Sequence, residues 1–311
     1  MKKLYLILIA LLTTRMQEAH RDTVDQEVRY HEVCFLTSHN SYAAWNHGFF
    51  YAQQALSLTE QLKQGVRGFM LDTHLDRSCN VVLCHGNERI TRFIKRGKAP
   101  LLLHEELKPL AHFLRTNPTE IITIFLENYV HDKQLLDTAF RTSGIADYIL
   151  TPSDWDPTKQ NGWPTLKWMH LQNKRLIIFN SLGETSLAYN QWQHVAENQW
   201  GTLIKRRACL ERRESFACRS HKRYLYVVNY FPSFRFNFGG SYQHINSTKL
   251  DHFLCSIFKG LNGKYAQQRL PNFISVDFTN EGDPMKHVSV NNTYRGRTKR
   301  LLFRPLEPDE H

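Results

Sequence analysis

The stretch VCFLTSHNSY, residues 33–42, joins a short apolar run to a polar run that holds a histidine and a carboxamide. The apolar residues have the length and composition of a buried strand, and His39 and Asn40 follow where that strand ends. One histidine at a strand end is more often a hydrogen-bonded turn residue than a catalytic group. The stretch becomes informative because several later apolar runs also end in titratable or ligating side chains.

Short β-rich runs alternate with longer amphipathic runs along the chain, which is the pattern of βαβ units around a parallel sheet. The strand candidates are residues 33–37, 66–71, 81–84, 121–126, 176–179, 224–228 and 273–276, with 148–150 as a weaker eighth. Apolar residues at helical spacing predict helices over 57–64, 103–116 and 133–143. The alternation predicts an α/β fold, a (β/α)8 TIM-type barrel in a single domain, distorted or incomplete in places.

The length and composition of the chain fit one globular domain. Its 311 residues suit a single large domain, because α/β barrels often contain about 200 to 250 residues. A content of 41% hydrophobic and 22% charged residues excludes a disordered or fibrous protein. We assign residues 27–290 to the barrel and residues 291–311 to a basic, weakly structured C-terminal tail.

The N-terminus has the pattern of a secretory signal. Lys2 and Lys3 precede the apolar run from Leu4 to Leu12, which is too short to span a bilayer. We predict a signal peptide over residues 1–19 without a defined cleavage site, since no Ala-x-Ala pattern is present; a short uncleaved anchor is the alternative. No other apolar stretch reaches about 20 residues. We therefore expect a mature chain without a transmembrane segment, secreted to the extracellular space or the periplasm.

The cysteines are interpreted in the light of export, because an oxidising compartment permits disulfides. Cys209 with Cys218 and Cys79 with Cys84 are the pairs nearest in sequence, although connectivity cannot be deduced from spacing alone. Cys34 lies inside an apolar run and is expected to be a buried thiol.

The net charge of +11 favours anionic partners, both nucleic acid and acidic membrane surfaces. The densest basic segment, residues 205–223, carries no nucleic-acid motif with interleaved aromatic residues. Since export favours the membrane, the expected partner is an anionic phospholipid headgroup or membrane surface, and no nucleic acid is expected.

Catalytic residues of βα barrels project from the carboxyl ends of several strands, so the residue after each candidate strand is the informative one. The side chains found there are His39 and Asn40, Asp72 and His74, His85, Glu127 and Asn128, Asn180, Asn229 and Tyr230, and Asp277. Any one of them has an ordinary explanation, such as a helix cap. Their recurrence at the end of strand after strand has no such ordinary explanation.

These side chains divide into two chemical groups. Asn40, Asp72 and Glu127 offer hard oxygen ligands suited to calcium or magnesium, whereas His39 and His85 transfer protons near neutral pH. Cleavage of a phosphodiester needs a base, an acid and a cation that offsets charge on the phosphate. The sequence supplies candidates for all three.

At these residues the chain resembles the X domain of phosphatidylinositol-specific phospholipases C. The resemblance lies in SHNSY at 38–42, GVRGFMLD at 65–72, CHG at 84–86 and IITIFLEN at 121–128, in the family's order. Further stretches are similar to secreted X-domain-like proteins of plants, fungi and bacteria, namely NPTE at 117–120, NYFP at 229–232 and LPNFISVDF at 270–278.

The resemblance implies that His39 and His85 flank the phosphate. It also implies that Asn40, Asp72 and Glu127 are ligands of a divalent cation, with calcium preferred over magnesium. Metal-independent members carry basic residues at the positions of Asp72 and Glu127, so acids there favour a cation.

Met70 departs from the family's pattern, because it stands where calcium-dependent members carry a glutamate. A thioether is a poor partner for a hard cation, so the site has one carboxylate fewer. That glutamate is also a candidate base in those members. We therefore assign His39 as base and His85 as acid, with the reverse assignment open.

Roles for the remaining strand-end residues stay open. Asn229 and Tyr230 are interpreted as lining a headgroup pocket, with an ordinary position at the barrel rim as an equal alternative. Asp277 either orients His39 by a hydrogen bond or caps a loop. His74 is given no catalytic role.

The predicted function is that of an exported phosphoric diester hydrolase of phospholipase C type, acting on a phosphoinositide or related lipid. One alternative is a phosphodiesterase of other lipid specificity. Another is a catalytically weak barrel that binds lipid or protein, with its cation site degraded at Met70. A nuclease stays open on charge alone.

Overall fold

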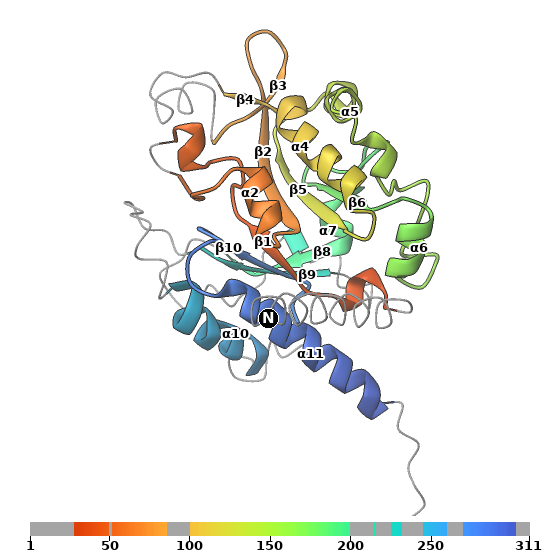
Figure 1. Ribbon diagram of the computed structural model, residues 1–311. Helices are drawn as coiled ribbons and strands as arrows, with labels where there is room; N and C mark the ends of the chain where they lie inside the picture. The colour runs from red at the N-terminus through yellow and green to blue at the C-terminus, as the bar shows by residue number, and fades with distance from the viewer. Residues whose placement is uncertain are drawn as a thin grey trace, which may run out of the picture.

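The computed structural model describes residues 28–49, 52–85, 100–199, 214–215, 225–231, 245–259 and 270–302, where eight parallel strands form one curled sheet (Figure 1). They are β1 (Phe35–Ser38), β2 (Gly68–Leu75), β5 (Ile122–Asn128), β6 (Leu176–Asn180), β7 (Tyr189–Asn190), β8 (Val195–Glu197), β9 (Leu225–Tyr230) and β10 (Phe273–Val276). Their order across the sheet is β7, β6, β5, β2, β1, β10, β9, β8.

The two edge strands of this sheet, β7 and β8, are consecutive in the chain and are linked by the four-residue helix α7 (Gln191–His194). Within the described residues they are not paired with each other. The chain therefore forms a single-domain α/β barrel of the TIM type that is open at one seam. This agrees with the distorted or incomplete barrel predicted from the sequence. Strands overlap the predicted ranges 33–37, 66–71, 121–126, 176–179, 224–228 and 273–276.

The strand predicted at residues 81–84 is present as β3 (Val81–Leu83), but it is not one of the parallel barrel strands, because it forms an antiparallel hairpin with the end of β2. Only the turn Asp76–Asn80 separates β2 from β3, whereas a parallel neighbour needs a crossover of about a dozen residues. The Asp76 carboxylate holds this turn by accepting bonds from the backbone N–H groups of Ser78 and Asn80. Beyond β3 the short strand β4 (Leu101–Leu102) pairs with it, also antiparallel.

The weaker eighth strand predicted at 148–150 is also not formed. The 3-10 helix η3 (Ala146–Tyr148) lies there, followed by a single bridge from Ile149 to Leu176. The strands that take its place, β7 and β8, span two and three residues. Runs of that length show no readable alternation of apolar and polar residues, so the sequence pattern missed them.

Three helices predicted from apolar spacing are confirmed as α2 (Leu58–Lys63), α4 (Leu103–Thr116) and α5 (Lys133–Thr142). Ser57 and Glu60 form a capping box at the start of α2, and the Asp132 carboxylate accepts two backbone N–H groups at the start of α5. The other helical segments are η1 (Tyr30–Glu32), η2 (Trp45–His47), α6 (Leu166–Leu171), the π-helical turn η6 (Ile245–Lys249), α10 (Leu250–Lys259) and α11 (Pro284–Leu302).

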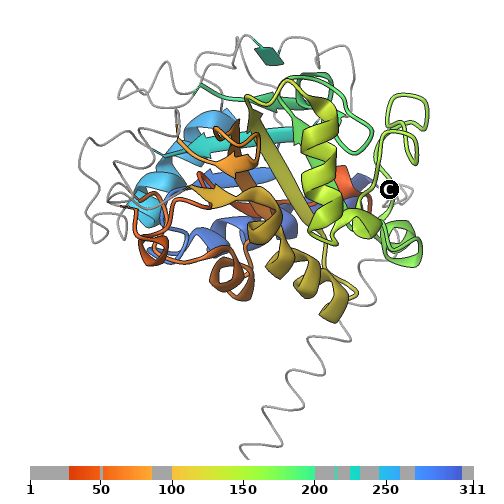
Figure 2. The same cartoon turned by 90° about the horizontal axis from the view of Figure 1, so that it is seen from above.

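The helices lie outside the curl of the strands, with α4 and α5 on one side and α10 and α11 on the other (Figures 1 and 2). Alternate strand residues, such as Leu36, Ile124 and Ile274, pack outward against the helices. Their neighbours along the strands face inward and fill the barrel with aromatic rings, including Phe125 and Phe273. Tyr30 of η1 joins this interior cluster, and its hydroxyl lies 2.6 Å from Thr123 Oγ1.

The predicted weakly structured tail is wrong as far as Leu302, because α11 continues to that residue. Polar side chains fasten the helix to the barrel: the Asn292 carboxamide pairs with the N–H (2.7 Å) and the carbonyl (3.0 Å) of Cys34. Arg295 donates to the carbonyls of His31, Leu270 and Pro271. Apolar spacing does not reveal a helix held in this way. Residues 303–311 lie outside the described part of the chain.

The cysteines agree with the predictions only in part. Cys34 is a buried thiol as expected, and burial raises its pKa to about 12. The candidate pair of Cys79 and Cys84 is not formed: both are free thiols, with Cys79 exposed in the hairpin turn and Cys84 buried at the far end of β3. A three-residue strand alone separates its ends by about 10 Å, beyond the limit of about 7 Å between the Cα atoms of a disulfide. Cys209, Cys218 and the signal over residues 1–19 lie outside the described residues.

Within the described ranges, no helix is both long enough and apolar enough to cross a bilayer.

Candidate active site

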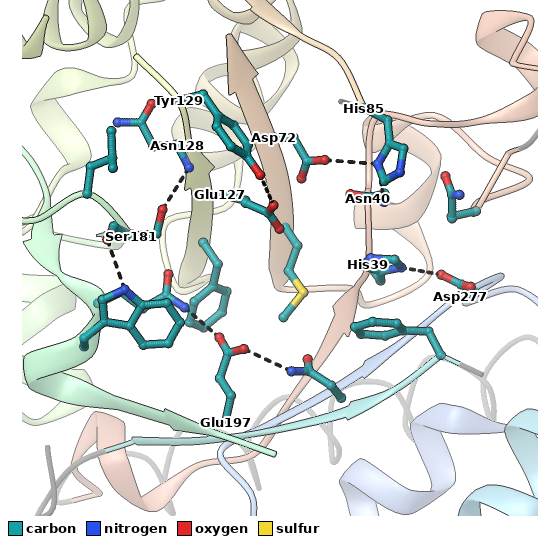
Figure 3. Close-up of a pocket in the computed structure, with 18 of the residues that line it drawn as sticks. His39, Asn40, Asp72, His85, Glu127, Asn128, Tyr129, Ser181, Glu197 and Asp277 are labelled. Carbon is teal, nitrogen blue, oxygen red and sulfur yellow. Dashed lines mark hydrogen bonds and ion pairs between the residues drawn. The ribbon is translucent and has the colours of Figure 1, made fainter. Parts of the chain in front are cut away.

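A cavity of about 490 Å³ lies at the carboxyl ends of the parallel strands (Figure 3). Side chains two residues apart on a strand point to the same side. Phe125 fills the barrel interior, so Glu127 on the same strand points into the cavity; Phe273 and Asp277 are related in the same way. Among the predicted site residues, the cavity is lined by His39, Asn40, Asp72, His85, Glu127, Asn229 and Asp277.

His39 follows β1 and is held on two sides. Its Nδ1 lies 2.8 Å from Asp277 Oδ1, on the loop after the neighbouring strand β10. Its ring stacks on Phe231, with 3.7 Å between ring centroids and 4° between the planes. Because a carboxylate accepts the Nδ1 proton, the other ring nitrogen, Nε2, is the one left to accept a proton from a ligand. Of the two alternatives for Asp277, the geometry agrees with the one that orients His39.

His85 has a similar arrangement at the end of the β2–β3 hairpin. Its Nδ1 lies 3.3 Å from Asp72 Oδ2, and this hydrogen bond raises the pKa of His85. The Tyr42 hydroxyl donates to the same carboxylate oxygen at 3.1 Å. The Asn40 carboxamide nitrogen is 3.5 Å from His85 Nδ1. The cavity therefore contains two histidines, each with a carboxylate at Nδ1.

Asp72 and Glu127 are direct neighbours on paired strands, since the register of β2 and β5 sets them opposite each other. With the Asn40 oxygen they form a donor set that suits a hard cation. The described residues contain no group of three or more His, Cys, Asp or Glu arranged to hold a metal. Met70 lies earlier on β2, and its sulfur accepts a hydrogen bond from Ser275 Oγ at 3.2 Å. The residues thus fit a cation that takes its remaining ligands from water or substrate.

The charge of the cavity is another indication of a cation. The carboxylates that line it are Asp72, Glu127, Glu197 and Asp277, and among its described lining residues there is no lysine or arginine. An anionic phosphate entering this cavity meets carboxylates from three strands and from the loop after β10. A histidine cation or a bound metal ion is needed to offset that repulsion.

Glu197 was missed by the sequence analysis, although it is a buried carboxylate in the cavity wall. Gln191 donates to its Oε1 at 2.6 Å and Asn229 donates to its Oε2 at 3.0 Å. These three residues form a polar part of the cavity wall, in which Glu197 is labelled in Figure 3. Glu197 ends the three-residue strand β8, so no strand pattern in the sequence identified it.

Tyr230 is not among the residues that line this cavity. It follows Asn229 on β9, so alternation turns its ring to the outer side, where it packs on Phe253 of α10 at 4.7 Å between centroids. Burial raises the pKa of Tyr230 to about 12. Of these two neighbours, Asn229 therefore lines the cavity and Tyr230 does not.

Tyr129 is a further residue of the cavity mouth that the sequence analysis missed. Its hydroxyl donates a short hydrogen bond to the Glu127 carboxylate, and its ring stacks on His74 at 4.3 Å between centroids. His74 itself does not line the cavity, and burial lowers its pKa. This position agrees with the absence of a catalytic role for His74.

Comparison with known proteins gives matches along most of the chain. Residues 26–292 match the PI-PLC X family model. A PI-PLC X domain-containing protein of Arabidopsis thaliana is 31% identical over 284 residues, 87% of this chain and 63% of the relative. An uncharacterized secreted protein of Arthroderma benhamiae is 23% identical over 296 residues, 88% of this chain and 64% of the relative. The chain thus spans a little under two thirds of the length of these two relatives.

Solved structures share the fold at low sequence identity. The phosphatidylinositol-specific phospholipase C of Listeria monocytogenes has a TM-score of 0.56 and 16% identity, with 86% of this chain and 95% of that chain covered. The phosphatidylinositol-specific phospholipase C of S. aureus has a TM-score of 0.55 and 15% identity, with 87% and 95% covered. At these identities the likeness is one of fold.

Proposed function

This chain belongs to the PI-PLC X family, and from that premise we propose that it is a phosphoric diester hydrolase of phospholipase C type. The observation that carries the proposal is the pair of histidines in one cavity, each with a carboxylate at Nδ1. A phosphodiester bound between them meets a proton acceptor on one side and a proton donor on the other. General acid–base catalysis of this kind contributes about 10²- to 10⁴-fold in rate.

His39 acts as the base in this proposal. Its Nε2 takes the proton of the attacking hydroxyl, while Asp277 holds the ring and stabilises the imidazolium that forms. His85 gives its proton to the glycerol oxygen as the bond from phosphorus to that oxygen breaks. With an inositol lipid the attacking hydroxyl is the neighbouring ring hydroxyl, so the new bond closes a cyclic phosphate and diacylglycerol leaves.

Asp72, Glu127 and Asn40 are the residues proposed to hold a divalent cation. The cation, when bound, offsets negative charge on the phosphate. We expect calcium rather than magnesium, because two carboxylates on neighbouring strands and an amide in the turn after β1 form an irregular oxygen site, and calcium tolerates irregular geometry. Met70 contributes no oxygen, so water or substrate completes the coordination.

The substrate proposed is a phosphoinositide or related lipid at a membrane surface. The wall of Glu197, Asn229 and Gln191 offers acceptors and donors suited to the hydroxyl groups of a polyol headgroup. The relative from Arthroderma benhamiae is described as secreted, and the net charge of +11 favours an anionic membrane. We therefore propose an exported protein that works at a lipid surface.

The direct test is product analysis by mass spectrometry on phospholipids of different headgroups, with calcium, magnesium or chelator. The wild-type protein is expected to release diacylglycerol and a cyclic or open headgroup phosphate. His39→Ala and His85→Ala are expected to lose this release while remaining folded and bound to vesicles. If no lipid gives a product while vesicle binding is retained, the proposed enzymatic activity is contradicted. That result would favour the alternative of a catalytically weak, lipid-binding barrel whose cation site is degraded at Met70.

A further inference from the structure

We propose that two buried carboxamides outside the cavity, Gln54 and Asn246, are positioning residues that hold Asp277 against His39. The inference rests on the proposed function for its catalytic consequence. Neither side chain lines the cavity, and both are fully buried. Each one is hydrogen-bonded to the backbone of the loop that follows β10.

That loop has an unusual backbone at Phe278, the residue after Asp277. Phe278 has a φ of +47°, in the left-handed region that costs a non-glycine residue conformational energy. Its N–H donates to the carbonyl of Gln53 at 2.8 Å, and its buried ring packs against Trp45, 5.0 Å away between centroids. The chain therefore turns sharply directly after Asp277, and this turn sets the direction of the carboxylate.

Gln54 fixes the strand side of this turn. Its amide nitrogen donates to the carbonyls of His39 (2.8 Å) and Val276 (3.2 Å), and its oxygen accepts the N–H of Thr279 at 3.2 Å. The orientation of the amide is unambiguous, because only an NH₂ group can face two carbonyls. One side chain thus connects the backbone of His39 to the two residues that flank Asp277 and Phe278.

Asn246, in η6, fixes the turn from the other side. Its amide nitrogen donates to the carbonyls of Asp277 (2.8 Å), Phe278 (2.9 Å) and Glu281 (3.2 Å). Loss of these bonds leaves buried carbonyls without that donor and frees the left-handed turn to relax. Asp277 would then move relative to His39, while the cavity walls that bind substrate stay in place.

A second consequence concerns the sequence Asn246, Ser247, Thr248, which is an N-glycosylation acceptor pattern. A glycan is attached to the amide nitrogen, and here that nitrogen is buried and bonded to three carbonyls. The folded protein therefore carries no glycan at Asn246. A second acceptor pattern begins at Asn291, on α11, where the side chain is partly exposed.

The kinetic test compares Asn246→Ala and Gln54→Met with the matched control Asn291→Ala, on phosphatidylinositol in mixed micelles with calcium. Asn291 also donates its amide nitrogen to a carbonyl, but that carbonyl belongs to His287, one turn earlier on its own helix α11, and not to the loop after β10. We expect kcat to fall about tenfold in the first two variants with KM within about twofold, because misplaced catalytic groups slow turnover without removing binding contacts. Asn291→Ala is expected to keep the wild-type kcat.

A double-mutant cycle separates positioning from general damage. In an Asp277→Asn background, Asn246→Ala is expected to cost less than about twofold in kcat, because the group it positions has already lost its charge. A loss that is the same in both backgrounds would overturn the proposal.

Two readouts need no turnover. The NMR signal of the His39 Nδ1–H proton is expected in the wild type and in Asn291→Ala, and it should broaden or vanish in Asn246→Ala and Gln54→Met at a temperature where all are folded. If the signal persists in both variants, the positioning role is overturned. If the signal is lost in both variants but the wild-type protein turns over no lipid, the positioning role is upheld and the proposed function is rejected. A glycan found on Asn246 of the folded protein, secreted from eukaryotic cells, would overturn the proposal without any variant.

Discussion

The two histidines of the cavity lie on parts of the molecule that are built differently. His39 follows β1 within the parallel sheet, lies 2.8 Å from its carboxylate and has 21% of its side chain exposed. His85 follows β3, which extends that sheet as an antiparallel hairpin with β2; it lies 3.3 Å from its carboxylate and has 55% of its side chain exposed. The same pairing of imidazole and carboxylate thus occurs once in a tight setting and once in an open one.

The difference bears on how each of the two proposed proton transfers would be constrained. The His39 side is determined by strand register, since Ser38 pairs with Val276, and by the carboxamides of Gln54 and Asn246. The His85 side depends on a hairpin whose contact with β2 includes one bond from the Cys84 N–H to the Asp72 carbonyl at 3.2 Å. A base must meet one hydroxyl at a fixed place, whereas an acid can follow a departing oxygen. The tight side therefore suits the base and the open side suits the acid.

The largest effect is expected from replacing either histidine, and a change of the substrate's leaving group then distinguishes their roles. His39→Ala and His85→Ala should each lower kcat on phosphatidylinositol by about a thousandfold. On an inositol phosphodiester with a nitrophenol leaving group, which departs without protonation, His85→Ala should recover most of its activity and His39→Ala should not. The measurement is kcat on both substrates, and recovery by His39→Ala instead would reverse the assignment of base and acid.

The next prediction concerns the carboxylates that hold the two rings. Asp277→Asn is expected to lower kcat by about a hundredfold, because the neutral amide no longer stabilises the His39 imidazolium. Asp72→Asn should in addition raise the half-saturating calcium concentration, since Asp72 contacts His85 and is also proposed to bind the cation. Calcium titrations of kcat for both variants check this. An unchanged half-saturating calcium concentration in Asp72→Asn would contradict the cation assignment.

A smaller effect is expected when the cation site alone is altered. Glu127→Gln should raise the half-saturating calcium concentration about tenfold and leave kcat at saturating calcium close to wild type, because one oxygen charge is lost. The exposed Glu184, outside the described cavity lining, provides the control Glu184→Gln. Turnover that is unaffected by chelator in the wild-type protein would reject a cation at Asn40, Asp72 and Glu127.

Met70→Glu tests the same site in the opposite direction. The position faces the cavity two residues before Asp72, so a carboxylate there adds an oxygen ligand to the set. We expect the half-saturating calcium concentration to fall several-fold relative to the uncharged control Met70→Gln. Equal calcium dependence in both variants would mean that the cation does not bind next to residue 70.

Much of the barrel was predictable from the sequence, because its longer strands are apolar runs that end in polar residues. The alternation of side chains then brings His39, Asp72, Glu127 and Asp277 to one cavity without further information. Strand ends alone did not distinguish Asn229, which faces the cavity, from Tyr230, which faces away. The exact strand register decides that point, and a slip of one residue reverses it.

Other features depend on contacts that no local pattern records. Glu197 ends a strand of three residues, and Gln54 and Asn246 are polar residues that resemble surface side chains in the sequence. Gln54 bonds the backbone of Val276, more than 200 residues away in the chain, and Asn246 bonds the backbone of Asp277, about 30 residues away. The helix α11 escaped prediction for the same reason, since it is fastened by Asn292 and Arg295 rather than by a regular apolar stripe.

The smallest effect is expected at Cys79, in the turn of the hairpin that precedes His85. Cys79 is exposed in its turn, so a thiol reagent should label it in the native protein, whereas buried Cys34, with its pKa raised to about 12, should stay unlabelled. Peptide mapping by mass spectrometry identifies the labelled site.

Cys79→Ser should change the free energy of unfolding by less than about 0.5 kcal/mol, because an exposed thiol in a turn contributes little. A bridge between Cys79 and Cys84 would instead protect Cys79 from the reagent and make the substitution cost about 2 kcal/mol or more. Since that bridge would tie the turn to the base of β3, finding it would also make the His85 side as constrained as the His39 side and remove the contrast between acid and base.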